Sequence, residues 1–269
     1  MSIEIVSLIF IAFICELLDS SLGMLYGTIL SPVLIIAGFE PLVVIPSILF
    51  SQAIGGSTAA MMHQRLKNVD FAIDGGMKKK VQEIGLMSSL KASINKDLKV
   101  VFVITSLGIL ATILAAQIAI NVPKDVLKTY IGILVLLMGM ILLLGIKFTW
   151  KNIIGLGLLS SFNKGMSGGG FGPVVTSGQI LTGRESKNSI AATTLAEAPI
   201  CITGFLTFYI TQGLATWNLV WLLSIGSILG AIIGPNITAK FTSERKVRIT
   251  LGIIVTILGI WTLVRTWLI

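Results

Sequence analysis

The chain has 269 residues, of which 54% are hydrophobic and only 12% are charged, and its mean hydropathy is +0.95. A soluble domain usually carries about 25% charged residues, so this composition excludes a cytosolic enzyme, a disordered protein and a nucleic-acid binder, despite a formal net charge of +8. Two cysteines and one histidine exclude a disulfide framework and a Cys/His zinc site. We therefore expect an all-α polytopic membrane protein in the lipid bilayer, with no metal and no cofactor.

Apolar segments follow one another along the chain. The first pair, 3–20 and 25–38, is joined by a glycine-containing tip, and no basic residue precedes it, so we expect it to be retained rather than cleaved as a signal peptide. A second pair, 152–163 and 171–182, has arms too short to cross the roughly 30 Å hydrocarbon core as full helices. The segments with the length of a membrane span are 42–62, 99–120, 127–146, 188–210, 217–239 and 249–268.

The lysines and arginines predict which side of the membrane each loop faces, because such residues are concentrated on the cytoplasmic side. If the basic regions are all cytoplasmic, the 152–182 pair enters and leaves from that side as a re-entrant hairpin. By analogy we expect the 3–38 pair to be a second hairpin, entered from outside, although its first arm is long enough to span. Both termini then lie outside the cell (plasma) membrane. The basic regions are 63–99, 147–151, 184–187 and 240–248, and the basic residues left outside are Lys124, Lys128 and Arg265.

The two halves of the chain repeat one pattern. Gly23-Met24-x-x-Gly27 matches Gly165-Met166-x-x-Gly169, and Gln52 matches Glu197. Each half is one hairpin plus three spans, and because three is odd the halves have opposite orientations in the membrane. Inverted repeats whose broken helices meet near the midplane are a recurring transporter design, so the repeat predicts transport. The first repeat is 1–147, with hairpin 3–38 and a cytoplasmic insert at 63–98, and the second is 148–269, with hairpin 152–182.

The tip of the second hairpin, residues 163–173, combines a run of glycines with a lysine. Glycines allow backbone N–H groups to turn toward a ligand, and Pro173 suits the first turn of the returning helix. The positive end of that helix then points at the tip, which favours anions, and Lys164 adds a full positive charge. The alternative is that the glycines only allow close helix packing, which does not explain the lysine.

The tip of the first hairpin, residues 19–28, is the predicted partner of the second tip. Its serines, the Tyr26 hydroxyl and its free N–H groups are expected to complete a binding pocket. Asp19 and Glu16 are ionisable residues in an apolar arm, and such residues are functional candidates by default. The alternative is that both carboxylates are solvated in a water-filled vestibule.

Glu197 is the only ionisable residue inside the 188–210 span. It is a candidate for binding a proton, for pairing with Lys164 or for donating a hydrogen bond to an anion; alternatively, it only joins helices by hydrogen bonds. Asp19 is the second candidate for coupling transport to an ion. The predicted substrate-binding residues are Ser20, Ser21, Gly23, Tyr26, Gly27, Gln52, Asn163, Lys164, Gly165, Ser167, Gly168, Gly169, Gly170 and Glu197.

Three further features have weaker signals. His63 lies at the cytoplasmic end of its span, where a histidine is usually solvated, and Cys15 and Cys201 are expected to be small apolar fillers. Residues 71–98 form a basic, mildly amphipathic insert. This insert is expected to be a solvated cytoplasmic loop or, alternatively, a surface for anionic lipid or a cytoplasmic partner.

Two stretches of the sequence resemble the TauE/SafE family of sulfite and organosulfonate exporters. The first runs from Gly23 to Pro32 and the second from Gly165 to Pro173, and the resemblance extends over nearly the whole chain. It implies transport of small sulfur-containing anions, often outward. The first copy lacks the glycine cluster of the second, so its tip is expected to contribute side chains, and the 71–98 insert exceeds the usual family loop.

We therefore expect a transporter, not an enzyme, that carries a small anion of the sulfite, sulfonate or thiosulfate class by alternating access around a midplane site at the two tips. The inside-negative potential, about 2.3 kcal/mol per charge per 100 mV, drives anions outward, so we expect export. One alternative is a divalent-cation carrier that uses Asp19, Glu16 and Glu197. Another is an intramembrane serine protease that uses Ser167 and His63.

Overall fold

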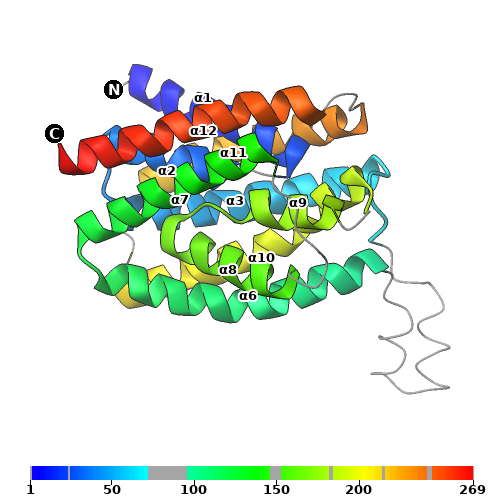
Figure 1. Ribbon diagram of the computed structural model, residues 1–269, viewed down its shortest axis with the longest axis horizontal. Helices are drawn as coiled ribbons and strands as arrows, with labels where there is room; N and C mark the ends of the chain where they lie inside the picture. Colours follow the sequence, from blue (N-terminus) through cyan, green and yellow to red (C-terminus); the bar gives the residue numbers. More distant parts are fainter. Residues whose placement is uncertain are drawn as a thin grey trace.

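The computed structural model describes the chain as a bundle of helices. Figure 1 shows these helices lying roughly along the long axis of the molecule, with both termini at the same end. Among the described residues there is no β-strand. Most of the 71–98 insert, residues 72–95, lies outside the described part of the chain. The described ranges are 2–23, 25–71, 96–145, 153–181, 184–213, 216–240 and 244–268.

The helices follow the predicted apolar segments in order. Six of them are long and apolar enough to cross a membrane, which makes the chain a multi-pass membrane protein. The helices are α1 (Ser2–Leu22), α2 (Tyr26–Ile36), α3 (Pro41–Arg65), α6 (Lys96–Asn121), α7 (Lys124–Leu144), α8 (Ile153–Ser167), α9 (Gly172–Leu181), α10 (Ser186–Gln212), α11 (Trp217–Ala239) and α12 (Glu244–Trp267).

Two helices differ from the predicted spans. Helix α1 has 21 residues, or about 31 Å at 1.5 Å per residue, and its Ile5–Leu22 stretch is one of the six candidate spans. The first pair is therefore one helix of span length followed by the short α2. Helix α12 has 24 residues and begins at Glu244, before the predicted start of its span at residue 249, so its first turn includes the charged sequence Glu244-Arg245-Lys246.

The second pair has short arms, as predicted. Helix α8 has 15 residues and α9 has 10, so they are about 22 Å and 15 Å long, less than the hydrocarbon core. Helix α8 lies along α6, where the Thr112 hydroxyl donates to the Ser161 carbonyl at 2.9 Å. The turn between α8 and α9 has positive φ angles at Gly168 and Gly170, a conformation that glycine adopts without strain.

Helices α3 and α10 cross at the centre of the bundle and are the most deeply buried of the candidate spans. Around them, α1 packs along α11, α8 along α6, and α7 along α12. Under the predicted repeat, α1 corresponds to α8 and α11 to α6, so the α1–α11 pair then has the α8–α6 pair as its counterpart. The inverted repeat itself stays a prediction.

Hydrogen bonds show which helix ends meet at the end of the bundle that carries the termini. The Lys124 ammonium at the start of α7 lies 2.6 Å from the Glu40 carboxylate, just before α3. The Gln212 amide at the end of α10 donates to the Leu42 carbonyl at 3.0 Å. The starts of α3 and α7 and the end of α10 therefore lie together.

The opposite end gathers the regions that are rich in basic residues. The Thr238 hydroxyl of α11 donates to the Ser21 carbonyl of α1 at 2.8 Å, and the Lys187 ammonium of α10 donates to the Ala239 carbonyl at 3.2 Å. The basic regions before α10 and after α11 thus share one end of the bundle, as the charge-based topology requires. Which end faces the cytoplasm stays a prediction.

The contact between α1 and α11 depends on glycine. A Cβ atom added at Gly226 would lie 2.3 Å from the Ile9 carbonyl oxygen, so Gly226→Ala must push the two helices apart. Such overpacking costs about 1–3 kcal/mol. We expect a lower temperature of thermal unfolding in detergent for Gly226→Ala. In the control Gly155→Ala, the added Cβ has nothing within 4 Å and the temperature should not fall; equal temperatures for the two variants would contradict this account.

Candidate functional site

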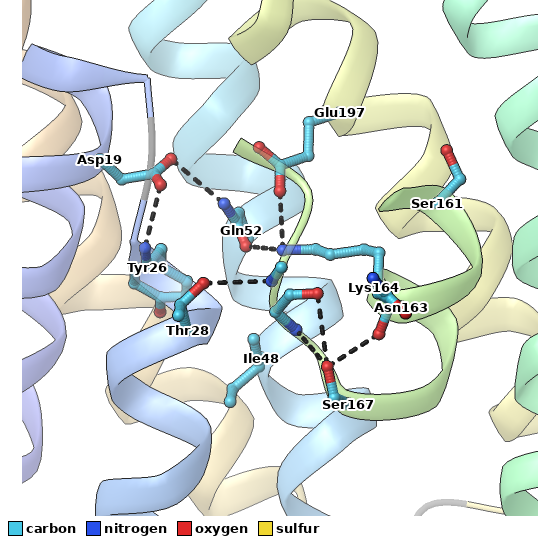
Figure 2. Close-up of polar contacts among 12 residues, drawn as sticks. Asp19, Tyr26, Thr28, Ile48, Gln52, Ser161, Asn163, Lys164, Ser167 and Glu197 are labelled. Atoms are coloured by element: carbon cyan, nitrogen blue, oxygen red, sulfur yellow. Dashed lines mark hydrogen bonds and ion pairs between the residues drawn. The ribbon is translucent and has the colours of Figure 1, made fainter. Parts of the chain in front are cut away.

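The two tips meet inside the bundle. The Gly170 N–H donates to the Thr28 hydroxyl at 3.1 Å, and Figure 2 shows the second tip passing directly beside the start of α2. A Cβ atom added at Gly27 would lie only 1.7 Å from the Gly168 carbonyl oxygen, and one added at Gly169 would lie 2.8 Å from the Gly27 carbonyl carbon. Gly27 and Gly169, which match each other in the predicted repeat, are therefore in backbone contact.

A buried ion pair lies beside this contact. The Lys164 ammonium comes from the last turn of α8 and lies 2.8 Å from Glu197 Oε1 of α10. The two side chains are 1% and 5% exposed. Lys164 also donates a hydrogen bond to Gln52 Oε1 of α3, so its charge is shared between the two central helices (Figure 2). Removing one partner of such a buried pair leaves an uncompensated charge.

Asp19 extends the network to the first tip. Its Oδ1 accepts the Tyr26 N–H at 2.9 Å and its Oδ2 accepts the Gln52 amide at 3.2 Å. Tyr26 is the first residue of α2, where the helix dipole and free N–H groups favour a negative charge. Gln52 therefore bridges Asp19 and Lys164, and a carboxylate of the chain itself already occupies the N-terminus of α2.

The hydroxyl and amide groups nearest to the tips bond within the protein. The Tyr26 hydroxyl shares a 2.8 Å hydrogen bond with Ser51, and Asn163 Oδ1 accepts the Tyr130 hydroxyl. The Ser167 hydroxyl donates to the Asn163 carbonyl at 2.8 Å and accepts the Gly169 N–H at 3.1 Å. These bonds fix the shape of both tips.

Some predicted residues lie outside the network. The Ser20 hydroxyl donates to the Glu16 carbonyl at 2.6 Å and the Ser21 hydroxyl to the Leu18 carbonyl at 3.1 Å, so both bond along their own helix. Gly165 packs against α6, where an added Cβ would lie 2.7 Å from the Thr112 carbonyl oxygen and from Ala115 Cβ. For these three residues a binding role stays a prediction.

Two threonines that the sequence analysis did not select hold the tips. Thr28 accepts the Gly170 N–H, and the Thr176 hydroxyl of α9 donates to the Gly23 carbonyl at 2.6 Å. The position of Thr28 directly after Gly27 in the repeated pattern was an available signal. Thr176 had none, since the sequence does not distinguish it from Ser177 and Gln179, the other polar residues of α9.

The expectation of a solvated His63 is wrong. Its side chain is fully buried, with Nε2 2.9 Å from the Ser20 carbonyl and Nδ1 3.0 Å from the Asn68 amide. The ends of α1 and α11 cover it, because Asn68 also donates to the Pro235 carbonyl at 3.0 Å. The hydrogen bonds described for His63 and Ser167 lead to other partners, so the structure offers no support for a serine–histidine dyad.

The carboxylates have separate partners rather than a common centre. Glu16 Oε2 accepts the Ser227 hydroxyl at 3.1 Å, whereas Asp19 bonds Gln52 and Glu197 pairs with Lys164. Within the described ranges no group of three or more His, Cys, Asp or Glu side chains is arranged to hold a metal ion. This arrangement gives no support to a divalent-cation carrier. Cys15 and Cys201 are both free and buried, as apolar fillers are.

The ion pair has a measurable signature in stability. We expect Lys164→Met and Glu197→Gln each to destabilise the protein, by about 3–5 kcal/mol for the lysine, because each leaves one buried partner unpaired. The double variant removes both charges and should lose less than the sum of the two single losses. Thermal unfolding in detergent measures all three. Stability losses that simply add would contradict an interaction between the two residues. The control Lys128→Met, at a partly exposed lysine, should change the stability little.

Comparisons with known proteins show the family of the chain. A probable membrane transporter protein, YtnM of Bacillus subtilis (strain 168), is 25% identical over 277 residues, which cover 96% of this chain and 82% of that protein. No solved structure matches the chain. The profile of the family described as sulfite exporter TauE/SafE matches residues 84–262, and the chain therefore belongs to the TauE/SafE family of membrane proteins.

Proposed function

We propose that this membrane transporter carries small sulfur-containing anions of the sulfite, sulfonate or thiosulfate class, and that Lys164 binds them. The observation that carries the proposal is the position of Lys164: a buried ammonium group where the two tips and the two central helices meet. The family description, sulfite exporter, supports the class of substrate.

The acceptors that now surround Lys164 indicate how an anion binds. Glu197 presents a carboxylate oxygen to the ammonium, and Gln52 presents an amide oxygen. An oxygen of sulfite or of a sulfonate is negatively charged and accepts hydrogen bonds, as the Glu197 oxygen does. The anion therefore replaces Glu197 at Lys164. The N-terminus of α9 then stabilises the remaining oxygens, because the N–H groups of the glycines at 168–170 already bond within the protein.

Alternating access follows from the contact between the tips. Because Gly27 and Gly168 touch through backbone atoms, an anion passes only if the two halves of the bundle separate. The bond from Thr238 to Ser21 joins the two halves at one end, and the bond from the Gln212 amide to the Leu42 carbonyl joins them at the other. Opening one set at a time exposes the site to one side of the membrane at a time.

Export is the direction that the membrane potential favours. An inside-negative potential contributes about 2.3 kcal/mol per charge per 100 mV to the outward movement of an anion. In the proposed orientation the basic end of the bundle, with the 71–98 insert, faces the cytoplasm, where a lipid surface or a protein partner is within reach of the insert. Both termini face the outside of the plasma membrane.

The orientation has a direct test. We expect a cysteine at Ser2→Cys to react with a membrane-impermeant maleimide on intact cells, and one at Lys240→Cys to react only after the cells are permeabilised. The native Cys15 and Cys201 are buried and should give little background in the unmodified protein. Labelling of Lys240→Cys on intact cells, with Ser2→Cys protected, would reverse the proposed topology.

The substrate and the role of Lys164 are tested by flux in proteoliposomes. We expect the protein to release trapped radioactive sulfite, and Glu197→Gln to retain binding because the Lys164 ammonium stays. The double variant Lys164→Met/Glu197→Gln should lose most of the flux although it is folded, and Lys128→Met should match the unmodified protein. Flux retained by the double variant would remove Lys164 from the site. Absence of flux for sulfite, a sulfonate and thiosulfate alike would overturn the substrate class.

A further inference from the structure

Glu16 is a buried carboxyl group that the proposed anion site does not use. It lies on α1 against α11 and α3 and has no solvent exposure. Its Oε2 accepts the Ser227 hydroxyl at 3.1 Å. Its other oxygen, Oε1, is buried and has no hydrogen-bond partner in the described part of the protein.

Glu16 also lacks a cation. Lys164, the buried ammonium of the described residues, is taken by Glu197 and Gln52, and no described ion pair includes Glu16. Asp19 differs, since its two oxygens accept hydrogen bonds from Tyr26 and Gln52. A buried carboxylate with one hydrogen bond and no counter-ion is strongly disfavoured, whereas a neutral carboxyl group is tolerated there.

The space around Glu16 limits what it binds. A Cβ atom added at Gly55 of α3 would lie 3.0 Å from Glu16 Oε2 and 1.9 Å from Ser227 Oγ. One added at Gly230 of α11 would lie 2.9 Å from Glu16 Cβ. The α3 backbone thus approaches the carboxyl group, and the α11 backbone approaches Glu16 Cβ. Among the described residues no group of His, Cys, Asp and Glu side chains is arranged to hold a metal ion here, so a proton is the cation that suits Glu16.

We propose that Glu16 binds a proton and that this proton is the ion coupled to anion transport; the second half of this statement rests on the proposed function. Glu16 stands one helical turn before Asp19, which Gln52 connects to Lys164. A charge on Glu16 therefore changes the electrostatic potential at the anion site. The titratable side chains that interact electrostatically with it come from four helices: Cys15 and Asp19 of α1, Tyr26 of α2, Lys164 of α8, and Glu197 and Cys201 of α10. Helix α11 carries no titratable residue, and those of α3, His63 and Arg65, lie in its last turn.

The coupling follows from charge. A negative Glu16 beside Asp19 and Glu197 repels an anion at Lys164, and a protonated Glu16 does not, so the proton and the anion bind together. In each cycle Glu16 takes one proton from water on one side and releases it to water on the other, in the direction of the anion. A dianion such as sulfite or thiosulfate still carries net negative charge when it moves with one proton, so the membrane potential continues to drive it outward. A sulfonate carries a single charge, so with one proton it moves as a neutral pair that the potential does not drive.

Transport driven by a pH gradient tests the coupling. The substrates are thiosulfate and methanesulfonate, which take up no proton near neutral pH, and the membrane potential of the proteoliposomes is clamped at zero. With one coupled proton, a gradient of one pH unit should concentrate the carried anion about tenfold at equilibrium. Glu16→Gln should still exchange the anion, but it should concentrate the anion no more than a control without a pH gradient. Asp125→Asn changes an exposed carboxyl group and should behave as the unmodified protein. The proposal is overturned if Glu16→Gln concentrates the anion as the unmodified protein does. It is also overturned if the unmodified protein does not concentrate the anion when a pH gradient is imposed.

Infrared spectroscopy tests the bound proton without any substrate. A protonated carboxyl group has a C=O stretching band that a carboxylate lacks. We expect the purified protein at neutral pH to show this band and Glu16→Gln to lose it, while Asp125→Asn keeps it. If Glu16→Gln does not fold, Ser227→Ala replaces it, and loss of the hydrogen bond should move the band to higher frequency. An unchanged band in these variants overturns proton binding at Glu16, whereas absence of anion flux with the band present overturns only the proposed function and its coupling.

Discussion

The ion pair between Lys164 and Glu197 is the constraint on which the centre of the molecule depends. A single ammonium group at the depth of the membrane core is stable only with partners close by, and the chain supplies them from two helices, Glu197 from α10 and Gln52 from α3. The break between α8 and α9 is the feature that brings the lysine there. A continuous helix in place of α8 and α9 would carry no turn at this depth and no second helix N-terminus beside the charge.

The network shows how carboxylates are compatible with the proposed anion site. Asp19 accepts a hydrogen bond at the N-terminus of α2, and Glu197 pairs with Lys164. The protein's own carboxylates therefore bind to the two groups that favour negative charge. Such internal partners keep the site stable when no substrate is bound. In the proposed binding step, Lys164 exchanges its contact with the Glu197 carboxylate for a contact with the anion. The free energies of the two contacts nearly balance, so binding is easily reversed at either side of the membrane.

Length and hydrophobicity were sufficient to predict the helices, because a span in lipid has no alternative way to satisfy its backbone. The glycines at 165–170 likewise predicted a turn, and the pairing of Lys164 with Glu197 was one of three roles open to Glu197. The sequence was not sufficient for the directions of side chains. Ser20 and Ser21 bond carbonyls of their own helix, a local alternative that the sequence leaves open. His63 is covered by α1 and α11, and this outcome depends on contacts between residues far apart in the chain.

The meeting of Gly27 with Gly168 and Gly169 has a genetic consequence. The atoms that a new side chain at Gly27 would strike are all main-chain atoms, and the same is true at Gly169, where they belong to Gly27 and Thr28. Replacing a neighbouring side chain by a smaller one relieves most steric clashes. Here the clashing atoms belong to the backbone, so no such replacement is available. A substitution at Gly27 therefore has no second-site suppressor among the residues that it touches. Each half of the chain thus limits what the other can carry at this matched pair of glycines.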